Sequence, residues 1–245
     1  MKIQKLTKLI AIWSFGATII LLLNLFFHYS ESLFMPLFSA IIFYLIYKEL
    51  TSHKTIKDFP QTLIKITPAI LLLSFVLFYI GIGMHGAANH IAYYFGEGVS
   101  LAKEYAYFYD EILGHVTMYL GLFGLMLGGS LIQARRPFTL QLDFKNISVL
   151  LFAAMFHGIG LATAMIEGHT SIFGLIAAII FIPLVSLHHI NKQRKLKIIV
   201  REYPFDFFIV LVMISTVFIL IAYFLIYKGF PEISTQFNFW KYMFI

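Results

Sequence analysis

Cysteine is absent from this chain of 245 residues, and its absence excludes several kinds of chemistry. Without thiols there can be no disulfide, thiolate zinc site, iron–sulfur cluster or cysteine nucleophile. Charged residues are also scarce, at 12% of the chain, whereas a soluble domain carries roughly a quarter. So few charges cannot cover a water-facing surface, and we expect most of the apolar surface to face a lipid bilayer.

Hydrophobic residues make up 60% of the chain, and they occur in long runs. A helix needs about 20 mainly apolar residues to cross the hydrocarbon core of a membrane. We therefore predict an all-α protein, a seven-helix bundle forming one transmembrane domain over residues 1–245. The predicted spans lie near 9–27, 33–47, 66–84, 112–132, 147–165, 172–187 and 205–226.

The basic residues predict the orientation of these spans. With the N-terminus inside, the outer segments hold only Lys103, Lys228 and Lys241 of the 18 lysines and arginines. Cytoplasmic loops are enriched in lysine and arginine, so this distribution predicts an inner N-terminus and an outer C-terminus in the cell membrane. The net charge of +6 is spread over short connections, which indicates membrane topology and not a nucleic-acid partner.

The longest predicted connection, residues 85–110, is rich in tyrosine and phenylalanine. Amphipathic rings of this kind prefer the membrane–water boundary, so we expect an outer interfacial segment. Gly96 and Gly98 are expected to divide it into two short helices. After it, Gly114, Gly121 and Gly128 recur along the fourth span, together with Gly124, and predict a close approach of a neighbouring helix.

Ionisable residues gather at the predicted outer ends of the spans. Asp110 and Glu111 open the fourth span, and Glu111 shares a helix face with His115, four residues later. Such a pair can hold a metal ion or pass a proton. The simpler explanation for the two acids is their favourable position at a helix N-terminus, but this does not explain His115.

His157 lies near the middle of the fifth span, where a histidine is costly unless it faces the bundle interior. His157 is therefore a candidate metal ligand, and the alternative is a histidine that makes an interhelical hydrogen bond for packing. Ala154, Gly158 and Ala162 form a row of small residues beside it, which predicts close contact with another helix.

Two further histidines, His85 and His90, follow the third span, and Glu167 and His169 follow the fifth. On a continuous helix His85 and His90 lie about 140° apart, so they need not serve one centre. Wetting by solvent at the interface is the simpler explanation for either histidine alone.

The convergence of these groups on one membrane face predicts a site that binds a divalent metal ion. Imidazole and carboxylate ligands without thiolate suit zinc, copper, iron or manganese. We expect Glu111, His115 and His157 as ligands, with Asp110 or Glu167 as a fourth ligand or general base. The remaining candidate ligands are His85, His90 and His169. The predicted function is a membrane metalloenzyme, a hydrolase or an oxidoreductase, acting on a lipid or small molecule.

Other classes of function stay open. Intramembrane histidine and glutamate can relay protons or move a metal ion, although the inner halves of the spans carry few polar groups. A haem held by two histidines, such as His115 with His157 or His85, is another alternative. A role as an accessory subunit of a membrane complex is a further alternative function.

Two families resemble this arrangement in architecture only. Rhodopsins also have seven spans and an outer C-terminus, but they bind retinal through a lysine in the last helix, and Phe205–Ile226 has none. The seven-helix hydrolases related to alkaline ceramidases and adiponectin receptors carry a histidine pair in the last helix, which is likewise absent here. No site residue is transferred from either family.

Overall fold

The computed structural model describes residues 4–24, 30–55, 60–95, 101–138, 142–191 and 196–233. Within these ranges every regular element is a helix and no strand occurs. The elements follow in the order α1 (Lys5–Asn24), α2 (Ser30–Thr51), α3 (Gln61–Phe95), α4 (Leu101–Tyr107), η1 (Phe108–Gly114), α5 (His115–Arg135), α6 (Phe144–Glu167), α7 (Ser171–Asn191), α8 (Leu196–Glu202) and α9 (Pro204–Tyr227).

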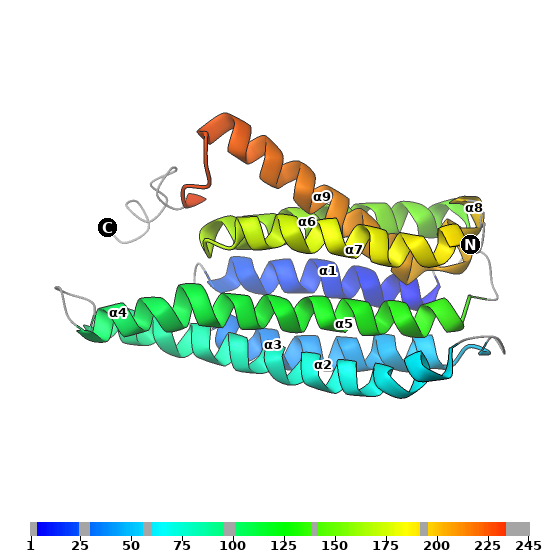
Figure 1. The fold of residues 1–245 in the computed structure, drawn as a ribbon, viewed down its shortest axis with the longest axis horizontal. Helices are drawn as coiled ribbons and strands as arrows, with labels where there is room; N and C mark the ends of the chain where they lie inside the picture. Colours follow the sequence, from blue (N-terminus) through cyan, green and yellow to red (C-terminus); the bar gives the residue numbers. More distant parts are fainter. Residues whose placement is uncertain are drawn as a thin grey trace.

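Most helices run along the long axis of the molecule, side by side (Figure 1). The most extensive contacts join α3 to α5, α6 to α9 and α1 to α2, and α1 also packs on α6. Helix α1 begins at one end of the bundle, and α9 finishes at the other, where its last turns lean away from the neighbouring helices (Figure 1). The two described ends of the chain therefore lie at opposite ends of the bundle.

Five helical segments of the described chain are long and apolar enough to cross a membrane: Phe34–Thr51, Gln61–Ala88, Glu104–Arg135, Phe144–Glu167 and Pro204–Tyr227. Large apolar side chains on their outer surface are open to the surroundings, with Phe218 70% and Leu225 71% exposed. Water would penalise such exposure and lipid would not, so these helices indicate a membrane protein.

The predicted first and sixth spans correspond to α1 and α7. Helix α7 contains a shorter apolar stretch, Ser171–Ser186, and α1 is not among the five long segments. A total of seven spans, and the side on which each terminus lies, therefore stay predictions.

The predicted outer segment, residues 85–110, is helical where it is described. Helix α3 continues without interruption to Phe95, and α4 begins at Leu101 and leads through η1 into α5. The predicted break at Gly96 and Gly98 lies outside the described residues. The position of this segment relative to the membrane also stays a prediction.

Glycines allow the backbones of α3 and α5 to approach closely, as their spacing predicts. A β-carbon on Gly121 would overlap the backbone of Phe78, and one on Gly81 would overlap the backbone of Met118. Between α6 and α9, a β-carbon on Gly158 would lie 2.9 Å from the carbonyl oxygen of Val212. The glycine contacts between α3 and α5 fix the distance between the two helices that carry the candidate site.

Candidate metal centre

Three of the predicted site residues meet at one end of the bundle. His85 comes from α3, Asp110 from η1 and His115 from the start of α5. Each offers one ligand atom, and the three atoms lie within 4.8 Å of one another. Asp110 and His115 are buried and His85 is half-buried. We call these residues the His85–Asp110–His115 group; in the described part of the chain no other group of three or more such side chains is this close.

A local change of helix type brings Asp110 and His115 together. In a regular α-helix, residues five apart point about 140° away from each other. The segment η1 is a π-helix, in which an amide bonds to the carbonyl five residues earlier, and the N–H of His115 donates to the carbonyl oxygen of Asp110. Both side chains therefore lie on one face of the chain, opposite α3.

The close approach of α3 to this π-helical turn depends on Gly114. A β-carbon at Gly114 would lie 2.7 Å from the carbonyl oxygen of Tyr109 and 3.1 Å from the backbone nitrogen of His85. Both contacts are shorter than ordinary van der Waals distances, so a side chain here would push α3 away. Gly114 thus places His85 within reach of Asp110.

Polar contacts offset the cost of burying these side chains. Nδ1 of His85 shares a hydrogen bond with Oδ1 of Asp110. The rings of His85 and His115 lie 4.5 Å apart between centroids, at an angle of 56°. Oε2 of Glu111 lies 3.6 Å from Nδ1 of His115, so the predicted pairing of Glu111 and His115 is present, although Glu111 is not in the group of three.

The turn between α6 and α7 closes one side of the group. A β-carbon on Gly168 would lie 2.7 Å from both Cδ2 and Nε2 of His115. The absence of a side chain at this position therefore lets the backbone press against the imidazole of His115. This contact fixes the imidazole with respect to the end of α6.

Glu167 and His169 lie at the same end of the bundle but bond elsewhere. Oε2 of Glu167 accepts a hydrogen bond of 2.8 Å from the backbone N–H of Ile233. Nε2 of His169 lies 2.8 Å from Oε1 of Glu232. Both side chains therefore hold the segment after α9 against the α6–α7 turn. Glu111 interacts electrostatically with His169 and Glu232, so this pair borders the group.

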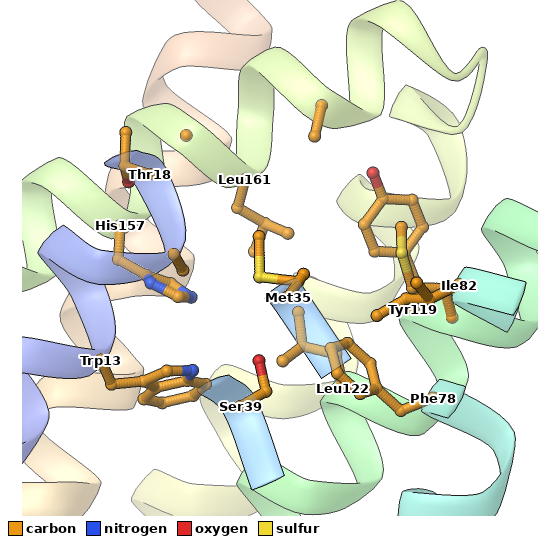
Figure 2. Close-up of a pocket in the computed structure, with 14 residues that line it drawn as sticks. Trp13, Thr18, Met35, Ser39, Phe78, Ile82, Tyr119, Leu122, His157 and Leu161 are labelled. Carbon is orange, nitrogen blue, oxygen red and sulfur yellow. The ribbon is translucent and has the colours of Figure 1, made fainter. Parts of the chain in front are cut away.

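The other two histidines among the predicted ligands are in different surroundings. His90 lies on α3, five residues beyond His85, and is half-buried. His157, on α6, lines a cavity of about 90 Å³ further into the bundle (Figure 2). Its ring lies 4.9 Å from that of Trp13, between centroids. Neither histidine belongs to the His85–Asp110–His115 group.

A buried ionisable pair at the opposite end of the bundle escaped prediction. Nε2 of His189, on α7, lies 3.0 Å from Oδ2 of Asp206, on α9, and both side chains are only 2% exposed. The ring of Tyr203 covers His189, with 4.6 Å between centroids. Asp206, in the first turn of the very apolar helix α9, was a signal available in the sequence, because an isolated carboxylate there would be costly.

Comparison of the chain with protein-family models, with curated proteins and with solved structures found no match. The class is therefore defined by the fold and the site alone. The protein is all-helical, has helices suited to a membrane, and carries a His/Asp group able to hold a metal ion.

Proposed function

We propose that this chain is a multi-pass protein of the cell membrane whose His85–Asp110–His115 group binds a divalent transition-metal ion at the outer end of the bundle. The observation that carries this proposal is the convergence of three ligand atoms, from two separate helical segments, within 4.8 Å. Burial of a carboxylate between two imidazoles is costly, and a shared cation would offset that cost.

The donor set favours zinc or iron(II). Two imidazoles and one carboxylate form the open, three-ligand arrangement that both metals use in catalytic sites. Copper is less well supported, because the group contains no sulfur donor, and the sulfur of Met165 near the end of α6 packs against Gly174 on α7. Binding would replace the proton that now joins His85 to Asp110, since a metal ligand must be deprotonated.

Three protein ligands leave room for water or substrate, and this favours an enzyme. Oε2 of Glu111 is buried and makes no hydrogen bond within the described residues. At 3.6 Å from His115, this carboxylate is suited to accept a proton from a bound water molecule. The proposed activity is metal-assisted hydrolysis or oxidation of a lipid or small molecule that reaches the site from the outer side.

The proposed topology has seven spans, with the N-terminus inside and the C-terminus outside. The five long apolar segments, together with α1 and α7, give this number. The opposite positions of the described chain ends support an odd number of crossings (Figure 1). The scarcity of basic residues near the outer segments supports the orientation.

Metal content of the purified full chain tests the proposal. We expect one equivalent of zinc or iron in the wild type, and less than a tenth of that in His85→Ala and His115→Ala. His90→Ala is the matched control, since it removes a histidine from the same helix, α3, but outside the group. Circular dichroism identifies any variant that fails to fold. Equal metal content in all four proteins would refute the proposal.

Transport of protons or of the metal ion is a second candidate function, and the His189–Asp206 pair favours it. This pair supplies buried ionisable groups at the inner end, which the sequence alone did not lead us to expect. Ion flux into proteoliposomes tests this candidate. Flux that is lost in Asp206→Asn, while the metal content is unchanged, would favour transport over catalysis.

A further inference from the structure

A partly open cavity of about 90 Å³ lies between α1, α2, α3, α5 and α6. Most of its lining is apolar, with Leu161, Leu122 and Phe78 around it (Figure 2). Trp13, Ser39 and His157 lie together on one side of it (Figure 2). The cavity is therefore mainly apolar, with these three side chains on one side and Tyr119 on another (Figure 2).

The imidazole of His157 lacks a polar partner within the described part of the chain. It is 8% exposed, and its ring lies 4.9 Å from that of Trp13 and 6.0 Å from that of Phe208, between centroids. A neutral imidazole offers one donor and one acceptor. A buried polar group without a hydrogen bond is costly, so His157 provides a position where a ligand oxygen would be stabilised.

The cavity lies about one helical turn below the His85–Asp110–His115 group. Tyr119 lines the cavity, and its ring stacks on that of His115, with 6.2 Å between centroids and 19° between planes. On α6, Ala164 lines the cavity, four residues before Gly168, which contacts His115. Four residues of helix advance about 6 Å, so both helices lead from the cavity to the group.

We infer that this cavity binds a small molecule with a narrow apolar body and one hydroxyl or carbonyl oxygen, which hydrogen-bonds to His157. A cavity of roughly 150 Å³ lined by aliphatic and aromatic side chains holds benzene. Met35 and Met118 line this smaller one, and methionine adapts its shape readily, so a single ring or short chain fits. That the ligand is the substrate of the metal centre rests on the proposed function; the binding itself does not.

Binding of 4-fluorophenol and fluorobenzene, followed by ¹⁹F NMR, tests this inference on the full chain in micelles after removal of metal by a chelator. The two probes differ by one hydroxyl group. We expect both to bind saturably, with 4-fluorophenol about three- to tenfold tighter because of one hydrogen bond. His157→Leu should abolish this preference and leave fluorobenzene binding intact.

Ala164→Phe, which fills the cavity, should abolish saturable binding of both probes. Partitioning into micelles without saturation, or a preference for 4-fluorophenol that persists in His157→Leu, would overturn the inference. Because no metal is present, the result for probe binding does not depend on the metal centre. A protein that binds the phenol but binds neither zinc nor iron would refute the proposed function and leave this cavity assignment intact.

Discussion

At the scale of single residues, the candidate centre depends on how buried charges are compensated. Asp110 is buried, and its carboxylate bonds to His85 while a second imidazole, His115, lies within ligand distance. Removing one partner of such a buried pair leaves an uncompensated group, which costs more than the pair itself contributes. The three residues are therefore expected to depend on each other.

The position of the His115 imidazole is sensitive to Gly168. Gly168→Ala would place a β-carbon 2.7 Å from the ring, and the ring must move. We expect metal affinity to fall about 10- to 100-fold, as it does when groups that orient a metal ligand are altered. Titration with zinc measures this. Gly83→Ala on α3 is the control, since a β-carbon there meets nothing within 4 Å; an equal loss in both variants would contradict the assignment.

The sequence allowed prediction of the residue types in the centre, but only part of their grouping. An α-helical reading joins Glu111 to His115, and that contact exists at 3.6 Å. On a regular α-helix, Asp110 and His115 point away from each other. A single sequence gives no clear signal for the π-helical turn that brings them together. The choice between His85 and His157 as partner depends on which helix packs against α5, and periodicity alone does not specify neighbours.

At the scale of elements, the pair α3 and α5 carries two of the three residues of the group, His85 and His115. Glycines at their contact let the backbones meet, with Gly121 facing Phe78 and Gly81 facing Met118. In a membrane, close packing of this kind is the main source of helix association. This pair therefore determines both the fold and the distance between His85 and His115.

Adding one methyl group to the contact between α3 and α5 should destabilise the protein. Gly121→Ala places a β-carbon against the backbone of Phe78, which cannot rotate away. We expect a loss of about 1–3 kcal/mol in the free energy of unfolding, typical of overpacking, and weaker metal binding. Unfolding in mixed micelles measures the first effect. A variant as stable as Gly83→Ala would show that the two helices are not in close contact.

The start of α6 should respond to pH through Asp143. The side chain of Asp143 accepts hydrogen bonds from the backbone N–H of Asn146, at 2.9 Å, and from its side-chain amide, at 2.7 Å. These bonds, the backbone one first, lower the pKa of Asp143 below its ordinary value. Because the folded pKa is the lower one, the stabilisation is complete above the ordinary value for aspartate, about 3.9, and is lost as pH falls through the folded value.

Amide exchange of the first turn of α6 tests this expectation. Protection should decrease in the wild type as the pH falls below about 4, after correction for the intrinsic pH dependence of exchange. In Asp143→Asn, which keeps an acceptor but does not titrate, protection should be lower at neutral pH and independent of pH in this range. The same acid-induced decrease in the variant would show that another group is responsible.

At the scale of the whole molecule, polar groups are segregated along the bundle axis. The His85–Asp110–His115 group lies at the end of the bundle that holds η1 and the α6–α7 turn, and the His189–Asp206 pair lies near the start of α9, at the other end. The five long apolar segments lie between these ends. The proposed metal site at the outer side therefore requires that the end carrying the His85–Asp110–His115 group face outward.

Labelling of single cysteines tests this orientation directly, because the chain has no cysteine of its own. Lys54 follows α2 and Lys228 follows α9, and both are exposed. In intact cells, a membrane-impermeant maleimide should label Lys228→Cys and should label Lys54→Cys only after permeabilisation. Labelling of both from the same side would exclude an odd number of spans between them.

Composition and hydropathy were sufficient to predict the helical membrane class, because exclusion of charge from lipid acts on the whole sequence. They did not predict that α3 would extend to Phe95. The residues beyond Met84 are less apolar, and only their packing against α4 and η1 explains why the helix continues. The His189–Asp206 pair was missed for a similar reason, since the two residues are brought together by the contact of α7 with α9.

X-ray absorption spectroscopy of the zinc-loaded full chain tests the central claim most directly. A centre built from His85, Asp110 and His115 predicts a shell of nitrogen and oxygen donors at about 2.0–2.1 Å, no sulfur, and the scattering pattern of two imidazoles. The zinc that remains bound in His85→Ala should show the signal of one imidazole. A spectrum of water ligands alone, or one with two imidazoles in His85→Ala, would contradict the assignment.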